Sequence, residues 1–444
     1  MLKAGVCKVN ITPFLGGPMS GYAARDHGSE RVHDELYAKA LVLDDGKTTV
    51  ALVTSDLIGI DRALSGEVRA LVKSQLGLPE SCVWLCGSHT HFGPHIYRSR
   101  HVEDSPYQTQ DEAYIQVLVH KMASAIKQAY ESRRPARLGS GRILAEGIHY
   151  NRRLIRDDGK VEMSLTLPPP YEGLAFGPVD REVGLLKVMG ETEDDVIASV
   201  INFACHPVSS TDRMYELSAD YPGYAMNLIE QVEGGVCLFA LGCAGNLVPI
   251  QRKGRSKRQV GLSLGGVALK GLQWILATDD IQIRAARKEI ILPVRASGSE
   301  EEMAKDITKA QAVLEAAQKR QASKRELTEL GEAVRVAEAM PRWAKRFSGQ
   351  GGCLTEIQAF RLGDIHIVGL PGEVFTELGM MVKKALAPAS VLVVSLSNDN
   401  PGYIPIRQAF DEGGYESTVS AFAPGAGEFM VEEALKLVAS LEGF

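Results

Sequence analysis

Six runs of apolar residues, rich in Val, Ile and Leu, show no regular alternation of polar and apolar positions. Central strands covered on both faces of a sheet have this pattern. The runs are residues 49–56, 82–87, 196–204, 236–242, 365–370 and 391–396. Segments with helical periodicity separate three pairs of them, at 64–76, 224–232 and 375–386. Strand–helix–strand alternation predicts parallel pairing through right-handed crossovers.

Four further segments have the pattern of meander or edge strands: 137–145, 183–188, 289–294 and 356–362. Because antiparallel strands would then join parallel ones, we expect mixed sheets rather than a doubly wound parallel sheet. The prediction is an α/β fold with mixed β-sheets flanked by helices.

Residues 299–345 are rich in Ala, Lys, Glu and Gln, which favour helices, and contain no glycine before Gly331. We expect an inserted, charged helical hairpin that ends near Pro341. Its composition favours two solvent-facing helices over an oligomer contact, and a homo-oligomer remains an open alternative. We find no internal repeat, so we expect residues 1–444 to form one domain that includes this hairpin.

Composition and charge narrow the class of partner. The 444 residues are 45% hydrophobic and 23% charged, as in soluble globular proteins, and 49 Lys and Arg against 55 Asp and Glu give a net charge of -6. Nucleic acids and membrane surfaces favour basic proteins, so we expect neither as a partner, and a small-molecule substrate instead. No apolar run approaches the roughly 18 residues that span a bilayer.

The seven cysteines are an odd number without a Cys-x-x-Cys pair, which favours buried thiols over disulfides or a zinc finger. The N-terminus enters patterned sequence at once, without a charged and then apolar leader. The expected localisation is therefore cytoplasmic.

The segment 87–95 holds three of the ten histidines, His89, His91 and His95, directly after an apolar run. Residues i and i+2 of an extended chain point the same way, so His89 and His91 can present two imidazoles to one ion. Ligands in open α/β sheets bind beyond the carboxyl ends of the strands. A His-x-His pair is also common without a metal, so the position after a strand is what favours a site here.

Other polar side chains follow other predicted strands. His206 follows 196–204, Asn246 follows 236–242, Glu373 follows 365–370, and a turn-rich loop with Asp399 and Tyr403 follows 391–396. Each has an ordinary interpretation when taken alone, such as a core histidine, a turn former or a helix N-terminal charge. Their coincidence at strand ends favours one shared site.

Imidazoles together with a carboxylate suit zinc, which accepts N and O ligands and in catalytic sites keeps a position for water. Bound zinc lowers the pKa of that water to about 7 and so supplies hydroxide near neutral pH. The most direct chemistry is attack on a carbonyl.

Several short motifs of the chain match a known family. The chain resembles the N-terminal catalytic region of neutral/alkaline non-lysosomal ceramidases over nearly all 444 residues. The matching segments are 4–13, 17–22, 32–37, 88–94 (Ser-His-Thr-His-Phe-Gly-Pro), 151–153, 202–207, 219–223 and 370–373 (Leu-Pro-Gly-Glu).

The resemblance implies a ceramidase-like catalytic domain and one zinc ion per chain. The ligands it implies are His89, His91, His206, Glu373 and Tyr403. It also implies a second tyrosine twelve positions after the ligand tyrosine, which here is Tyr415. That hydroxyl would donate a hydrogen bond to the developing oxyanion, worth on the order of 3 kcal/mol.

Two departures weaken the expectation of a lipid substrate. The ceramidases of this family carry a serine in an Asp-x-Ser-Pro loop, and the matching loop 246–249 has Val248 at that position. The chain also ends soon after a helix expected at 427–441, so we expect no C-terminal immunoglobulin-like domain, and we expect no secretion signal. We therefore expect a small or polar soluble substrate.

Basic residues near the expected site offer contacts for such a substrate. Arg152 or Arg153 is predicted to bind a substrate carboxylate through a forked pair of hydrogen bonds. The basic run 252–258 (Arg-Lys-Gly-Arg-Ser-Lys-Arg) is a second candidate for a carboxylate or phosphate, but a solvated loop is favoured there.

The predicted function is a zinc-dependent amidohydrolase that cleaves an N-acyl bond with zinc-activated water. Tyr415 and a backbone N–H around Gly245 and Asn246 would stabilise the oxyanion. His95 and Asp56 are candidates for proton transfer or for support of the ligands, with a structural role equally open. His33, next to Asp34, is expected to border the pocket.

Two alternatives remain. One keeps the metal and changes the bond, giving an ester or lactone hydrolase or a sugar-acid lyase, because oxygen leaving groups need less protonation than amines. The other is a non-catalytic metal- or ligand-binding relative, which Val248 favours and the full ligand set opposes. A dinucleotide loop at 261–266 is rejected because its spacing is wrong.

Overall fold

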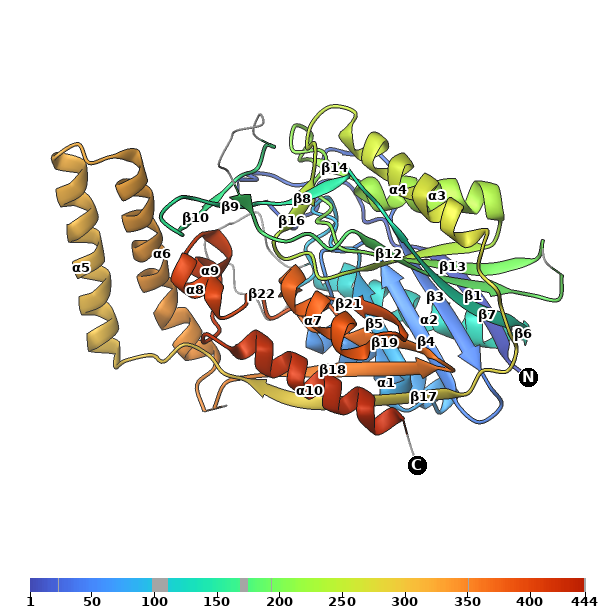
Figure 1. Ribbon diagram of the computed structural model, residues 1–444. Helices are drawn as coiled ribbons and strands as arrows, with labels where there is room; N and C mark the ends of the chain where they lie inside the picture. The colour runs from blue at the N-terminus through green and yellow to red at the C-terminus, as the bar shows by residue number, and fades with distance from the viewer. Residues whose placement is uncertain (23, 98–110, 168–174, 193, 350, 443–444) are drawn as a thin grey trace.

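The computed structural model describes residues 1–22, 24–97, 111–167, 175–192, 194–349 and 351–442 (Figure 1). Its first sheet has the order β5-β4-β3-β1-β6. The strands are β1 (Lys3–Asn10), β3 (Tyr37–Asp44), β4 (Thr49–Ser55), β5 (Val83–Gly87) and β6 (Arg134–Pro135). β4 and β5 pair in parallel, and the other pairs are antiparallel. Helices α1 (Arg62–Leu76) and α2 (Glu112–Glu131) bury their apolar faces in one core with strands of this sheet.

The second sheet has the order β15-β13-β12-β7. Its strands are β7 (Arg137–Leu144), β12 (Glu182–Met189), β13 (Val196–Phe203) and β15 (Val236–Leu241). Only β13 and β15 pair in parallel, and α3 (Asp220–Glu233) connects them. Helices α3 and α4 (Ser256–Leu272) share an apolar core with this sheet, and in Figure 1 they lie together on its outer side.

The third sheet has the order β17-β18-β19-β21. Its strands are β17 (Ile283–Leu292), β18 (Cys353–Leu362), β19 (Ile365–Gly369) and β21 (Ser390–Val394). β19 and β21 pair in parallel around α7 (Thr376–Leu386), and α10 (Ala426–Leu441) contributes to the same core.

A central apolar core joins the three sheets. It contains Leu41 and Trp84 from the first sheet, Leu186 and Val200 from the second, and Phe360 from the third. Trp84 is fully buried and meets Phe360 edge-on, with ring centroids 5.0 Å apart. The sheets are therefore packed into one body, and strands of different sheets end near one another.

Short pairs of strands hold the loops at these strand ends. They are β2 (Arg31–Val32) with β14 (Glu216–Leu217), β8 (His149–Asn151) with β16 (Leu247–Pro249), and β20 (Glu373–Val374) with β22 (Tyr403–Ile404). A small sheet of β9 (Arg153–Ile155), β10 (Val161–Met163) and β11 (Ala175–Phe176) lies beside them. The remaining short helices are η1 (Glu80–Cys82), α8 (Gln408–Glu412) and α9 (Tyr415–Val419).

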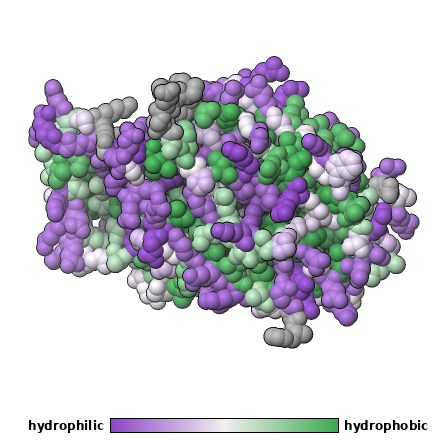
Figure 2. All heavy atoms as spheres, viewed as in Figure 1, coloured by the Kyte–Doolittle hydropathy of each residue, from purple (hydrophilic) through white to green (hydrophobic). Residues whose placement is uncertain are grey.

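The helical hairpin consists of α5 (Glu300–Lys319) and α6 (Lys324–Arg346), which project from one end of the molecule (Figure 1). In the view of Figure 2 this end is largely hydrophilic. The prediction that the hairpin ends near Pro341 is wrong, because α6 continues through that proline to Arg346. Trp343 and Phe347 pack against the core of the third sheet. Their burial offsets the backbone hydrogen bond that a proline inside a helix removes.

The fold class is as predicted, because the six apolar runs correspond to β4, β5, β13, β15, β19 and β21 in mixed sheets with helices around them. Two of the expected edge strands are parts of the longer strands β17 and β18. All seven cysteines are free thiols, and six are buried. Among the described residues, no helix is both long and apolar enough to cross a membrane.

Candidate metal centre

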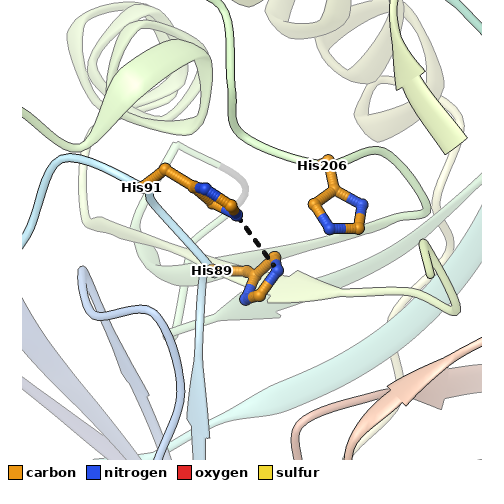
Figure 3. A group of neighbouring side chains, drawn as sticks. All are labelled: His89, His91 and His206. Atoms are coloured by element: carbon orange, nitrogen blue, oxygen red, sulfur yellow. Dashed lines mark hydrogen bonds between the residues drawn. The ribbon is translucent and has the colours of Figure 1, made fainter. Parts of the chain in front are cut away.

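Three histidines from two sheets meet beyond the ends of their strands (Figure 3). His89 and His91 follow β5, and His206 follows β13. One ring nitrogen from each lies within 4.8 Å of the other two. The Nε2 atoms of His89 and His91 are 3.4 Å apart. Three nitrogen donors at this spacing can hold one metal ion.

The backbone fixes how each ring is oriented. Nδ1 of His89 lies 2.6 Å from the carbonyl oxygen of Ile58, and Nδ1 of His91 lies 3.0 Å from that of Gly21. Nδ1 of His206 lies 2.6 Å from the carbonyl oxygen of Ala244. A carbonyl oxygen can only accept, so each Nδ1 carries the proton. Each Nε2 then has its lone pair free for a ligand bond.

Glu373 completes this group of donors. Its Oε2 lies 3.4 Å from Nε2 of His89 and 3.4 Å from Nε2 of His206. The Nε2 atom of His206 is buried and makes no hydrogen bond of good geometry to a described residue. A buried polar atom without such a partner is energetically costly. Because Nε2 of His206 points toward His89 and Glu373, a cation bound between them would supply the missing partner.

The electrostatics keep the donors in the protonation state that a metal needs. Burial lowers the pKa of His206 to about 4. Burial and the charges of His89 and His206 hold the pKa of His91 well below its ordinary value. Burial alone would raise the pKa of Glu373, but the two neighbouring imidazoles keep it well below its ordinary value. At neutral pH, His91 and His206 thus offer neutral imidazoles and Glu373 offers a carboxylate.

Two unusual backbone conformations bring His91 and His89 into place. His89 has φ 69°, a left-handed conformation that costs energy for a residue with a side chain. Gly21 has φ 107°, and a Cβ atom there would lie 2.6 Å from the ring of His91. The absence of a side chain lets the Gly21 carbonyl approach His91.

Both tyrosines named by the sequence lie next to this group. Glu373 and Tyr403 are directly paired in the parallel strands β20 and β22. The Tyr403 ring stacks on His206 with centroids 6.5 Å apart, and Tyr415 meets Tyr403 nearly perpendicularly at 5.7 Å. Burial and the charge of Glu373 raise the pKa of Tyr403, and Arg152 opposes them.

Arg152 and Arg153 are buried and bound within the protein. Nε of Arg152 donates to Glu416 at 2.6 Å, and its Nη2 donates to the Gly245 carbonyl and to the Tyr403 hydroxyl. Arg153 pairs with Glu412 at 2.9 Å and with Glu416 at 3.3 Å. A substrate carboxylate would have to displace these partners. The structure therefore favours a supporting role over the predicted substrate contact.

Two groups of the loop at 245–246 are engaged within the protein. The Gly245 N–H donates to the carbonyl of Val374, so it is not available to an oxyanion. The Asn246 side chain is fully buried; its oxygen accepts from the backbone N–H of Thr376, and its nitrogen donates to Glu377. This side chain ties the loop to the start of α7.

The other candidates lie on neighbouring elements. Nδ1 of His95 is 3.1 Å from the hydroxyl of Ser20. Asp56 accepts the backbone N–H of Tyr37, and burial raises its pKa to about 6. His33 lies 3.1 Å from the hydroxyl of Tyr224 and 3.6 Å from Glu216. A role for His33, His95 or Asp56 in substrate binding or proton transfer stays a prediction.

Sequence reasoning overlooked Arg25. It is buried, and it donates to the backbone carbonyls of His91 and Met214, each at 2.6 Å, and of Ser20. Its side chain fastens the loop with Gly21 to the loop with His91. No local pattern marks such a residue, because its acceptors are backbone atoms and two of them, in His91 and Met214, lie far away in the sequence.

Comparisons with known proteins give the family and the fold of the chain. The family model described as "Neutral/alkaline non-lysosomal ceramidase, N-terminal" matches residues 2–240. The chain is similar in fold to the neutral ceramidase of Pseudomonas aeruginosa, with a TM-score of 0.74 and 19% identity over 99% of this chain and 74% of that one. It is also similar to a ceramidase complexed with C2, with a TM-score of 0.74 and 17% identity over 99% of this chain and 75% of that one.

Proposed function

Because the chain belongs to the neutral/alkaline non-lysosomal ceramidase family, we propose that it is a zinc-dependent hydrolase that cleaves the N-acyl amide bond of a small, polar substrate. Family and fold support hydrolysis of an amide bond. The observation that carries the zinc dependence is the convergence of three Nε2 atoms and one carboxylate from three sheets.

The donor set fits zinc in type and spacing. Zinc binds imidazole nitrogen and carboxylate oxygen at about 2.0–2.2 Å, and tetrahedral ligands then lie roughly 3.3–3.5 Å apart. Three donor pairs here are 3.4 Å apart: His89 with His91, His89 with Glu373 and His206 with Glu373. Tyr403, paired with Glu373 across β20 and β22, is the candidate for a further ligand.

When bound, zinc would supply a Lewis acid and a water molecule of pKa about 7 for attack on the carbonyl. The protein's own groups do the rest. The Tyr415 hydroxyl donates a hydrogen bond to the carbonyl oxygen as negative charge develops on it. Arg152 donates to Tyr403 at 3.2 Å and is held by Glu416, so the Tyr403 ring stays oriented beside His206.

The small, polar substrate is proposed because the walls of the site differ from what the family's ceramide reaction uses. Val248 stands where the ceramidases of this family carry a serine. It is fully buried in an apolar cluster with Tyr150 and Val208. Its isopropyl group cannot donate a hydrogen bond to a lipid amide, so whatever that serine contributes is missing.

The test is metal analysis combined with an activity assay. Protein purified without added metal is analysed for bound ions and assayed on a panel of N-acyl amides of increasing acyl length. We expect about one zinc per chain, and activity greatest on short acyl groups. The variant His206→Ala should lose both zinc and activity, whereas His120→Ala, an exposed histidine on α2, should lose neither. Full activity in metal-free protein would refute the proposal.

The same site gives one alternative, hydrolysis of an ester or lactone. It is favoured by Val248 and by the engaged Gly245 N–H, because a site with fewer hydrogen-bond donors suits a better leaving group. Matched ester and amide substrates with the same acyl group separate the two. The amidase would be favoured if the ratio of kcat/KM for the ester to kcat/KM for the amide is no larger than the ratio of their uncatalysed hydrolysis rates.

A further inference from the structure

Beside the candidate metal centre, Arg252 has no carboxylate partner among the residues that the structure describes. The basic run 252–258 is less solvated than predicted, because Lys257 is buried and pairs with Glu216 at 3.2 Å. Lys253 is exposed, whereas Arg252 is half-buried. Nε of Arg252 donates a hydrogen bond to the backbone carbonyl of Val208 at 3.3 Å. No carboxylate in the described part of the chain forms an ion pair with Arg252. Its charge is therefore not neutralised by any described carboxylate.

Arg252 faces the wall of the metal centre. Val208, which accepts from Arg252, follows the ligand His206 by two residues and packs in the apolar cluster with Tyr150 and Val248. Tyr22 packs against the same cluster, and its ring centroid is 5.2 Å from that of His91. One tyrosine ring thus separates Arg252 from a metal-binding histidine.

The Tyr22 hydroxyl is a second polar group at this position, beside Arg252. It is buried and has no partner of good hydrogen-bond geometry among the described residues. Burial and the Asp220 carboxylate raise the pKa of Tyr22, and the charges of Arg252 and Arg25, with a contact between its hydroxyl and the Arg252 side chain, oppose them. Arg25 cannot serve a ligand, because its nitrogens donate to backbone carbonyls. Arg252 and the Tyr22 hydroxyl remain next to each other, and among the described residues no carboxylate pairs with Arg252 and no group makes a well-formed hydrogen bond to the hydroxyl.

We propose that Arg252 and the Tyr22 hydroxyl bind a carboxylate on the amide substrate, so that the enzyme prefers N-acyl amino acids over neutral amides. This inference rests on the proposed function. A guanidinium pairs with a carboxylate through a planar fork, and a phenol adds one more donor. A single free positive charge matches a monoanion better than a phosphate dianion.

The test uses two matched series. The first contains N-acetylglycine, N-acetyl-β-alanine and N-acetyl-4-aminobutyrate, each compared with its terminal carboxamide. The zinc-loaded wild-type protein should show a kcat/KM at least about 10-fold higher for the best acid than for its carboxamide, through a lower KM. Arg252→Met should bring this ratio to about one. Lys253→Met, which removes an exposed charge from the same loop, should keep the wild-type ratio.

The second series measures binding without reaction. Levulinate has the shape of N-acetylglycine with a CH2 group in place of the amide nitrogen, and 5-hydroxy-2-pentanone is its neutral counterpart. Calorimetric titration of zinc-loaded protein should show binding of levulinate that Arg252→Met weakens about 10-fold and Lys253→Met does not.

The outcomes separate the two proposals. Binding of levulinate that depends on Arg252, without hydrolysis of any amide, would support the subsite and refute the amidase. Hydrolysis with no preference for acids, or equal losses on acids and carboxamides in Arg252→Met, would refute the subsite and leave the amidase standing. Absence of both binding and hydrolysis would overturn the subsite.

Discussion

At the scale of single residues, one backbone carbonyl decides how each imidazole of the centre can act. The carbonyls of Ile58, Gly21 and Ala244 hold the Nδ1 protons of His89, His91 and His206. Each Nε2 lone pair is therefore directed before any ion arrives. Such supporting contacts typically change metal affinity by 10- to 100-fold.

Gly21 gives a direct test of this support. In Gly21→Ala the new methyl group would collide with the ring of His91, 2.6 Å away, and the positive φ would be strained. We expect zinc affinity to fall about 10- to 100-fold, measured by competition with a fluorescent chelator. Gly16→Ala is the control, because Gly16 has φ 87° on the same loop and no atom within 4 Å of the added Cβ. Equal losses in the two variants would mean that strain alone matters.

Asp220 predicts how stability depends on pH. It is fully buried at the start of α3, and burial raises its pKa to about 6. The folded state then holds this proton more tightly than the unfolded state, so the stability contribution is present at low pH and is lost as pH rises from about 4 through about 6. Asp220→Asn should remove up to about 3 kcal/mol of this pH dependence in urea unfolding.

The exposed residue Asp364 provides the comparison, as Asp364→Asn changes the same chemical group without burial. Burial also raises the pKa of Asp56 and of Asp399 to about 6. Their contributions to the pH dependence are the same in variant and wild type, so they cancel in the difference between the two. A difference between Asp220→Asn and wild type that is constant from pH 4 to pH 7 would contradict the assignment.

At the scale of elements, short strands and one short helix assemble the side of the site that carries the tyrosines. The parallel pair β20–β22 sets Glu373 opposite Tyr403, and helix α9 begins at Tyr415. Glu416, the next residue of α9, pairs with both Arg152 and Arg153. The ion pairs therefore fasten α9 to the strand β9 and to the ring of Tyr403.

Glu416→Gln tests this fastening. It leaves two arginine side chains buried without a full counter-charge, which typically costs about 3–5 kcal/mol, seen as a lower free energy of unfolding in guanidinium chloride. Activity should fall as well, because Tyr403 and Tyr415 lose their support. Glu412→Gln removes only the partly exposed partner of Arg153 and should cost clearly less. A wild-type unfolding curve for Glu416→Gln would show that the pairs do not hold α9.

At the scale of the whole molecule, the candidate metal centre lies where three sheets meet. His89 and His91 follow a strand of the first sheet, His206 follows a strand of the second, and Glu373 lies between β19 and β21 of the third. An ion held by all four would cross-link sheets that otherwise touch through the shared apolar core.

Zinc should therefore stabilise the whole fold. Zinc at 100 times its dissociation constant adds about 2.7 kcal/mol, so chelation should lower Tm in differential scanning calorimetry, and readdition should restore it. In His206→Ala, chelator should change Tm little, because the four-ligand site is broken. A Tm unaffected by chelator in the wild type, with zinc shown to leave, would mean that the ion does not join the sheets.

Much of the architecture follows from local sequence. The strands β4, β5, β13, β15, β19 and β21 are continuous apolar runs, and such runs need burial on both faces wherever they lie. The convergence of His89, His91, His206 and Glu373 follows from their shared place after strands. The membership of the family was also readable from short motifs.

Only the tertiary structure decided which polar groups are free. Arg152 and Arg153 meet Glu416 across more than 260 residues of chain, and Arg252 meets no carboxylate in the described structure. Likewise, α6 runs through Pro341 because distant core residues bury Trp343 and Phe347. Hydrophobicity and periodicity are properties of a segment, so the sequence determined the elements and the strand-end donors. A partner is a property of two segments brought together, so the fold alone determined which charges are satisfied and which can meet a substrate.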